Sequence, residues 1–430
     1  LIGAGNNNCI SDANNSVIVG GTLNTASDDY SVIGGGKLNV ASGEYASVLG
    51  GLCNLASGDK SVVVGGRINT ASGGTAFIAS GEFNKATAVC SFIGNGGSNC
   101  VGSSFSAIVN GQNNDIAATE ACYSFIGSGK SNFIKGTGAG PKVGAMSSIV
   151  AGCGNGMYSS SFSFIGDGYE NLLSGSNYSN IVGGKRNEIK SLNLEDSGYS
   201  SIVGGSGNEI TQSCYSFIGG GGGHLITGLY SFIGGGFCNI NNSSQGVLVG
   251  GSGNFICNNG NITLVGGCGN IASGCCTFLG GGLNNTSCGQ ISTLVGGTEN
   301  TASGNCSFIG GGRDNIASSI GSVVVGGCNN NSQALYASIG GGYNNDVIAN
   351  YGTIGGGVSN YINDDYGTIG GGISNCLLSQ YSYNTIGGGC GNTMCGGCLS
   401  VIGGGWTNKI IYFSPYSTIA GGRANEISGS

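Results

Sequence analysis

One pattern of apolar and polar positions repeats along the chain about every 15 residues: an aliphatic residue, any two residues, Gly, two more, then Asn. Counting that Asn as position 0, there are 27 units, from Asn8 to Asn425. Position −6 is aliphatic and position −3 is Gly in all 27, and His224 is the only replacement of the Asn. Self-similarity at a fixed period predicts a solenoid, in which each unit stacks on the next. Representative members of the Gly and Asn files are Gly36, Gly51, Gly66, Gly312, Asn39, Asn54, Asn69, Asn300 and Asn315.

A single unit, residues 30–44, shows what each repeat forms. Residues 30–33 are short, β-branched and alternating, which is typical of a strand, and the glycines at 34–36 then turn the chain. A small apolar residue two places after Asn39 marks a second strand, and Ser42 and Gly43 form a second turn. Two short strands and two turns per unit predict an all-β protein. We expect one continuous parallel β-solenoid (β-roll) of about 27 rungs over residues 1–430.

The invariant positions have structural explanations. A Gly at every position −3 indicates a backbone with positive φ, or a contact too close for a Cβ atom. The Asn amide can bond backbone groups of its own and adjacent units. We therefore interpret the Asn file as a buried structural ladder and His224 as a substituted member of it, not as a catalytic base.

The repeat lengthens at three places, near 115–124, 134–147 and 189–199. These insertions contain residues that the regular units avoid: Lys135, Pro141, Lys142, Lys190, Glu195 and Asp196. Loops on a rigid scaffold are frequent recognition sites. Tolerated drift at the edge of a solenoid explains the insertions equally well.

Outward positions carry a second pattern. Position −7 alternates with the core aliphatic residue and is Phe in eight units: Phe77, Phe92, Phe125, Phe164, Phe217, Phe232, Phe278 and Phe308. A file of phenylalanines on one face predicts cover by other copies of the chain. After Phe308 the file becomes Thr353, Thr368 and Thr385, and position −2 turns apolar at Tyr343, Val358, Ile373, Cys390 and Trp406. Either contacts move between faces here, or the strand reverses which face packs its own core.

Composition narrows the classes of protein. Gly is 93 of 430 residues without a three-residue period and Pro is only 2, which excludes collagen. Strict apolar periodicity and low charge argue against disorder. A net charge of −7 with 13 basic residues argues against nucleic-acid binding. No apolar run approaches the length of a membrane span.

No cofactor is predicted. The chain starts within a unit at Leu1, which we interpret as a fragment or a processed product.

The 19 cysteines occur at many positions of the repeat. Their odd number and irregular spacing do not resemble a disulfide framework. We expect small apolar side chains packed in or near the core, and assembly in a reducing compartment. The alternative is a few bridges, for example Cys395 to Cys398, or Cys275 and Cys276 to neighbours. One Cys-Gly-Gly-Cys motif is weak evidence for zinc.

Residues 30–43 and 306–318 resemble the head repeats of YadA-like trimeric autotransporter adhesins, and similar repeats occur in phage and virus tail fibres. The resemblance covers nearly the whole chain. It implies a left-handed β-roll, three chains side by side, and attachment to surfaces from an extracellular, cell-surface or virion-surface location. The chain departs from the adhesin pattern in lacking a heptad stalk and in its many cysteines. Because of these departures, a virion fibre and an extracellular filament stay alternatives to a bacterial adhesin.

Three classes of function remain. The first is a non-enzymatic structural or adhesive fibre, a homo-oligomer (a trimer by the resemblance) or a head-to-tail filament, with a host-surface protein or glycan as a further partner. The second is a tailspike-like enzyme that cleaves polysaccharides with paired carboxylates; the acidic residues show no cluster at a repeated position. The third is ice binding through Thr353, Thr368 and Thr385. No catalytic or metal-binding residue can be named.

Overall fold

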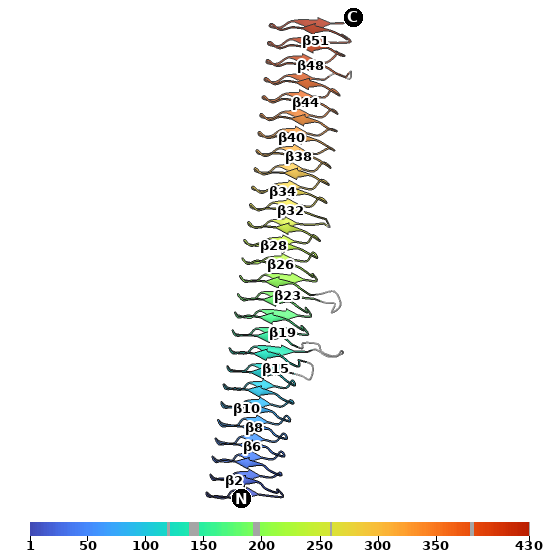
Figure 1. The fold of residues 1–430 in the computed structure, drawn as a ribbon. Helices are drawn as coiled ribbons and strands as arrows, with labels where there is room; N and C mark the ends of the chain where they lie inside the picture. Colours follow the sequence, from blue (N-terminus) through green and yellow to red (C-terminus); the bar gives the residue numbers. More distant parts are fainter. Residues whose placement is uncertain (118–120, 137–145, 192–197, 259, 379–381, 430) are drawn as a thin grey trace. The chain divides into compact units, whose positions relative to one another are not determined.

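The computed structural model describes residues 1–117, 121–136, 146–191, 198–258, 260–378 and 382–429. Within these ranges it contains 53 short strands and no helix. The chain divides into two compact units, Leu1–His224 and Leu225–Ser430, and each is a stack of similar turns (Figure 1). The two units together hold about 27 turns. The predicted all-β parallel solenoid is confirmed, whereas one continuous body over residues 1–430 stays a prediction.

In unit 1, the odd-numbered strands form one parallel sheet and the even-numbered strands another. The odd strands are β1 Cys9–Ile10, β3 Thr25–Ala26, β5 Val40–Ala41, β7 Leu55–Ala56, β9 Thr70–Ala71, β11 Lys85–Ala86, β13 Cys100–Val101, β15 Asp115–Ala117, β17 Phe133–Lys135, β19 Gly156–Tyr158, β21 Leu172–Ser174, β23 Glu188–Lys190 and β25 Glu209–Thr211. The even strands are β2 Val17–Ile18, β4 Val32–Ile33, β6 Ser47–Val48, β8 Val62–Val63, β10 Phe77–Ile78, β12 Phe92–Ile93, β14 Ala107–Ile108, β16 Phe125–Ile126, β18 Ser148–Ile149, β20 Phe164–Ile165, β22 Asn180–Ile181, β24 Ser201–Ile202 and β26 Phe217–Ile218.

Unit 2 repeats this arrangement. Its odd strands are β27 Leu225–Ile226, β29 Ile240–Asn241, β31 Phe255–Ile256, β33 Ile271–Ala272, β35 Thr286–Ser287, β37 Thr301–Ala302, β39 Ile316–Ala317, β41 Asn331–Ser332, β43 Asp346–Val347, β45 Tyr361–Ile362, β47 Cys376–Leu377, β49 Thr393–Met394, β51 Lys409–Ile411 and β53 Glu426–Ser428. Its even strands are β28 Phe232–Ile233, β30 Val247–Leu248, β32 Thr263–Leu264, β34 Phe278–Leu279, β36 Thr293–Leu294, β38 Phe308–Ile309, β40 Val323–Val324, β42 Ser338–Ile339, β44 Thr353–Ile354, β46 Thr368–Ile369, β48 Thr385–Ile386, β50 Val401–Ile402 and β52 Thr418–Ile419.

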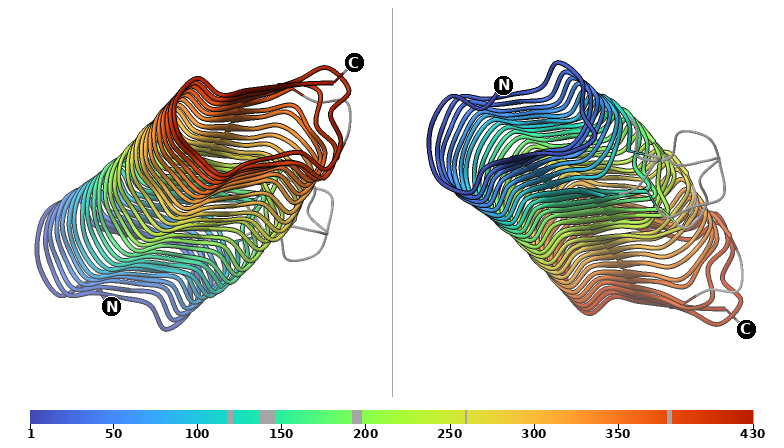
Figure 2. Two further views of the ribbon diagram at one scale, coloured as in Figure 1. Left: turned by 90° about the horizontal axis from the view of Figure 1, so that it is seen from above. Right: turned by 90° about the horizontal axis from the view of Figure 1, so that it is seen from below.

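Every turn is built the same way. The even strand covers positions −7 and −6, and the odd strand begins at position +1. Each residue pairs with its equivalent one turn further on, as Val32 pairs with Ser47. A third row of single bridges runs along position −2, for example between Lys37 and Leu52. Seen along the stack, successive turns of each unit follow nearly the same outline (Figure 2).

The core lies between the two sheets and is formed by positions −6 and +2. Ile33 and Ala41 are both fully buried, and nearly all their equivalents are too. Burying one such aliphatic side chain stabilises by about 1.5–3 kcal/mol. A single turn therefore buries too little to fold alone and depends on its neighbours. The core position −6 stays buried at Ile354, Ile369 and Ile386, so the alternative in which the late strands reverse their faces is wrong.

The predicted insertions near 115–124, 134–147 and 189–199 each begin inside an odd strand. Residues 118–120, 137–145 and 192–197, which include Pro141, Lys142, Glu195 and Asp196, lie outside the described residues. Lys135 and Lys190 are not loop residues but end β17 and β23. The strands on both sides keep their register, as Asp115 pairs with Phe133.

Candidate interaction surfaces

The buried asparagines bind each turn to the next. Asn39 is fully buried. Its Oδ1 accepts a hydrogen bond from the backbone N–H of Asn54 at 2.9 Å, and its Nδ2 donates to the carbonyls of Gly35 (2.9 Å) and Gly51 (3.0 Å). The backbone N–H of the buried His224 donates to Asn208 Oδ1 at 3.1 Å, as an Asn at this position does. The ladder is therefore structural, and its members are buried except Asn8, which is half-buried, and Asn425, which is exposed.

The invariant glycines have both properties expected from the sequence: a positive φ and a neighbour too close for a Cβ atom. Gly66 has a φ of 86°. A Cβ atom there would lie 2.7 Å from Asn69 Nδ2 and closer still to the carbonyl oxygen of Gly81. Any larger residue would therefore strain the backbone and push the ladder Asn out of place.

A second buried polar file lies at position −8, where Ser recurs in the sequence. The Ser16 hydroxyl donates to the carbonyl of Asp28 at 2.7 Å and accepts from the backbone N–H of Ser31 at 3.2 Å. Our reading of the sequence missed this file. The recurrence of Ser two residues before the core aliphatic residue was the available signal.

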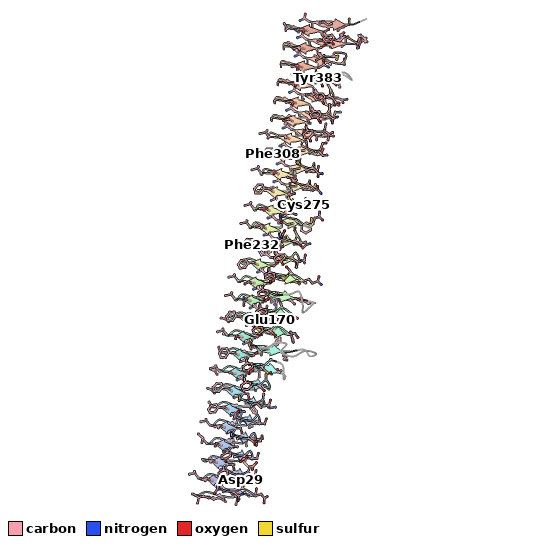
Figure 3. The ribbon with its side chains drawn as sticks, turned by 45° about the vertical axis from the view of Figure 1, so that its right-hand side comes forward. Asp29, Glu170, Phe232, Cys275, Phe308 and Tyr383 are labelled. Carbon is pink, nitrogen blue, oxygen red and sulfur yellow. The ribbon has the colours of Figure 1, made fainter. Side chains whose placement is uncertain are left out.

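The outer face of each even-strand sheet carries an apolar stripe, here called the outer stripe. It consists of positions −7 and −5. Four of the predicted phenylalanines, Phe92, Phe125, Phe164 and Phe278, are exposed, and Phe77, Phe217, Phe232 and Phe308 are half-buried. Figure 3 shows Phe232 and Phe308 on one side of unit 2. Position −5 adds exposed residues that the sequence reading overlooked: Val19, Leu49, Val64, Val109, Val150, Val182, Val203, Val249, Val265, Val295 and Val325.

Within the outer stripe, the two positions compensate each other in size. In all eight turns with Phe at −7, position −5 is Gly or Ala, and none of the eleven turns with Val or Leu at −5 has Phe at −7. The ring of Phe308 lies across its own turn, with Cε1 3.4 Å from the point that a Cβ of Gly310 would occupy. The ring therefore covers the space that Val fills in other turns.

The outer face of the odd-strand sheets is different in chemistry. Its position +1 carries charged residues in both units: Lys85, Asp115, Glu188, Glu209, Asp346, Lys409 and Glu426. The outer stripe has no charged residue at −7 or −5 in any turn. Charge depletion is typical of the centre of a protein interface, which singles out the even-strand face.

In the later turns of unit 2, from Tyr343 to Trp406, exposed apolar residues stand at position −2. Tyr343, Val358, Ile373 and Trp406 are exposed there, and Cys390 is half-buried. Their backbones pair from turn to turn along one row. On the outer stripe of these turns, Thr353, Thr368 and Thr385 form a single row in register. Glycines, not a second row of threonines, stand at position −5 beside them.

Exposed charges pair between neighbouring turns. Arg186 Nε lies 2.6 Å from Glu170 Oε2, and Arg67 Nη2 lies 3.0 Å from Glu82 Oε2. The hydrogen bond from Arg186 lowers the pKa of Glu170. Exposed pairs of this kind contribute at most about 1 kcal/mol each to stability, so they do not define a site.

The cysteines were expected in or near the core, and the part of that expectation that places them in the core is wrong. All 19 are exposed or half-buried, because none occupies position −8, −6, 0 or +2. The structure has no disulfide among the cysteines it describes. The Sγ atoms of Cys275 and Cys276 lie 3.5 Å apart, and this hydrogen bond raises the pKa of the Cys275 thiol.

Acidic residues do follow one another at repeated positions, contrary to the expectation from the sequence: Asp29, Glu44 and Asp59 occupy position −10 in three consecutive turns. Glu188 and Glu209 lie in register on β23 and β25. Elsewhere, Asp364 is 1% exposed, and burial raises its pKa to about 6. Among the described residues, no group of three or more His, Cys, Asp or Glu side chains could hold a metal ion.

The fold and these surfaces define a β-solenoid repeat protein with an uncharged apolar stripe. No helix in the described ranges is long and apolar enough to cross a membrane. Neither a protein-family model nor a curated protein sequence matches the chain.

Proposed function

We propose that this chain is a non-enzymatic structural or adhesive fibre subunit that assembles with copies of itself through the outer stripe. The observation that carries the proposal is the outer stripe itself, which is apolar in most turns, lacks charge, and pairs every Phe at −7 with Gly or Ala at −5. Both positions point away from the chain's own core, and neither carries a charged residue in any turn. Such a stripe suits close contact with a partner whose surface follows its shape, because protruding and missing atoms both weaken packing.

A second copy is the partner that suits this stripe best. The stripe presents one apolar side chain in most turns, and turns of a parallel sheet repeat at roughly 4.8 Å. A partner that contacts the whole stripe must present groups at the same spacing, and another copy of the chain does. The lack of charge on the stripe suits burial between copies.

The number of copies and the location rest on the resemblance to trimeric adhesin heads and tail fibres. It supports three copies, an extracellular, cell-surface or virion-surface position, and attachment to a host protein or glycan. The late apolar corner from Tyr343 to Trp406 is then the surface through which unit 2 makes its further contacts.

The test is the molar mass of the protein in solution, measured by sedimentation equilibrium. We expect the wild-type chain to self-associate and the double variant Phe278→Asp/Val295→Asp to be monomeric. The matched control is Ile271→Asp/Ile316→Asp on the outer face of the odd strands, where both side chains are also exposed. The control should associate like the wild type. A monomeric wild-type chain, or equal loss in both variants, would contradict the proposal.

The alternative of a polysaccharide-cleaving enzyme has one observation in its favour, the Glu188–Glu209 pair. Retaining glycosidases place two carboxyl groups about 5–5.5 Å apart, and neighbouring parallel strands are separated by roughly 4.8 Å. Incubation with capsular or host glycans decides between the functions. New reducing ends that disappear in Glu188→Gln would favour the enzyme, and their absence favours the fibre.

A further inference from the structure

Tyrosines gather at one corner of the turn, two residues before the outer stripe begins. Twelve of the 18 tyrosines occupy position −9. The backbone there is left-handed: φ is 57° at Tyr351 and 59° at Tyr366. The backbone N–H of Tyr366 donates to the carbonyl of Asn350 in the preceding turn at 2.9 Å, and that of Tyr351 donates to Leu335 at 2.8 Å. These bonds give successive tyrosines the same backbone geometry, so their side chains leave the chain in the same direction.

The rings therefore stack in register. In unit 2 the longest stack contains Tyr336, Tyr351, Tyr366 and Tyr383, whose exposed fractions are 55, 44, 43 and 53%. The ring centroids of Tyr351 and Tyr366 are 4.7 Å apart with 3° between the ring planes. The flanking pairs are at 5.4 and 4.6 Å. Figure 3 shows Tyr383 toward the side of unit 2 away from the labelled phenylalanines.

Stacking alone does not explain why these residues are tyrosines. In unit 1, Phe162 occupies the same position and stacks on Tyr178 at 4.9 Å with 2° between the planes. A phenyl ring therefore serves the geometry equally well. What tyrosine adds is a phenol, which can lose an electron and a proton and become a phenoxyl radical.

We propose that adjacent tyrosines of this stack, Tyr351 and Tyr366 foremost, are a site of oxidative cross-linking by a peroxidase using hydrogen peroxide. Each phenol loses one electron and its hydroxyl proton, and the unpaired electron spreads to the ring carbons beside the C–O bond. Two such carbons, one on each ring, form a new C–C bond. Each then releases its hydrogen as a proton while each oxygen regains one. The peroxide accepts two electrons and two protons and leaves as two waters.

The stack suits this chemistry for two reasons. Radical coupling joins the faces of the rings, and parallel rings one turn apart already present their faces to each other. Holding both partners in this geometry replaces an encounter between molecules. Their exposure leaves room for the rings to swing outward once the bond has formed. The product is a covalent link between consecutive turns, at a corner where the fold supplies backbone hydrogen bonds, ring contacts and the bonds that the side chains of Asn350 and Asp365 accept from the preceding turn.

Two double variants with equal numbers of tyrosines test the proposal in the full-length chain. Tyr336→Phe/Tyr383→Phe keeps Tyr351 and Tyr366 adjacent. Tyr351→Phe/Tyr383→Phe retains a complete ring stack but leaves the remaining tyrosines two turns apart. Each protein is treated with a haem peroxidase and limiting hydrogen peroxide. Dityrosine is measured by fluorescence, and linked peptides are identified by their loss of two hydrogens in mass spectrometry. Circular dichroism checks that both variants are folded.

We expect the Tyr351–Tyr366 link in the wild type and in the first variant, with a yield independent of protein concentration. In the second variant, coupling within this stack should fall at least about tenfold, since the favourable orientation is gone. Equal coupling within the stack in both variants would overturn the proposal, and so would the absence of a link between Tyr351 and Tyr366 in the wild type. A third contrary result would be preferential coupling of Tyr412 and Tyr416. These two are more exposed, and no tyrosine is stacked on them in the described residues.

Discussion

Replacing Asn300 by Ala tests whether the buried ladder holds consecutive turns together. Asn300 is fully buried. Its Oδ1 accepts from the backbone N–H of Asn315 at 2.9 Å, and its Nδ2 donates to the carbonyls of Gly296 at 3.1 Å and Gly312 at 2.9 Å. The Gly312 carbonyl keeps a second donor, the backbone N–H of Thr298. The truncation therefore leaves the N–H of Asn315 and the carbonyl of Gly296 without their partners.

The expected cost follows from these two groups. A buried donor left without a partner costs about 1–3 kcal/mol, and one further lost hydrogen bond costs about 1 kcal/mol. Asn300→Ala should thus destabilise unit 2 by about 2–4 kcal/mol. Asn305, five residues further on, is the matched control, because its exposed Oδ1 accepts only one bond, from the backbone N–H of Gln290 at 3.0 Å. Asn305→Ala should cost less than about 1 kcal/mol.

Amide hydrogen exchange is the suitable assay, because a stack of repeats can open locally without global unfolding. Peptides that contain the amide of Asn315 should lose protection in Asn300→Ala and keep it in Asn305→Ala. Urea denaturation should rank the two variants in the same order. If both variants exchange alike at Asn315, the ladder does not hold the turns together in the way described.

Three further predictions concern single positions. Gly66→Ala should destabilise by more than about 3 kcal/mol, because of the left-handed backbone and the contact with Asn69, whereas Gly65→Ala, with open space around its Cβ, should be nearly neutral in urea melts. Folding raises the pKa of Asp364 from 3.8 to about 6. The contribution of Asp364 to the free energy of unfolding is therefore greatest below about pH 4 and declines by up to about 3 kcal/mol as the pH rises through 6. Asp364→Asn should abolish this decline, measured as the urea midpoint at each pH. Cys238 and Cys306 are exposed, so a thiol reagent should label them in the folded protein without denaturant, and protection of both until unfolding would contradict their placement.

The fold was predictable because the same physical demand recurs in every turn. A buried aliphatic side chain such as Ile33 and a ladder residue such as Asn39 must satisfy the same neighbours each time, so the period alone reveals them. The outer stripe was only half predictable. The phenylalanines were visible as a file, but the valines at −5 alternate with glycines, and each row alone looks irregular. The constraint acts on the pair of positions, which a search of single rows does not detect.

The cysteines and tyrosines show that the average behaviour of a residue type does not predict its burial or backbone conformation in this fold. Cysteine is buried in most proteins, and that average misled us, although its absence from positions −6 and +2 was already visible in the sequence. The tyrosine stack was missed because a bulky residue with positive φ is uncommon. Nothing in Tyr366 itself indicates a left-handed backbone, which is imposed by the hydrogen bonds between turns.

The size compensation can itself be tested by breaking and restoring it in one turn. Thr263 and Val265 occupy positions −7 and −5 on and next to β32, and Val265 is exposed. Thr263→Phe alone places a ring beside a valine, a combination absent from the chain, and the resulting protrusion should weaken self-association by about 1–3 kcal/mol. Thr263→Phe/Val265→Gly recreates the Phe–Gly pair of Phe278 and should restore association in sedimentation equilibrium. If the single variant associates as tightly as the double, the pairing of Phe with Gly or Ala is not imposed by a contact between copies.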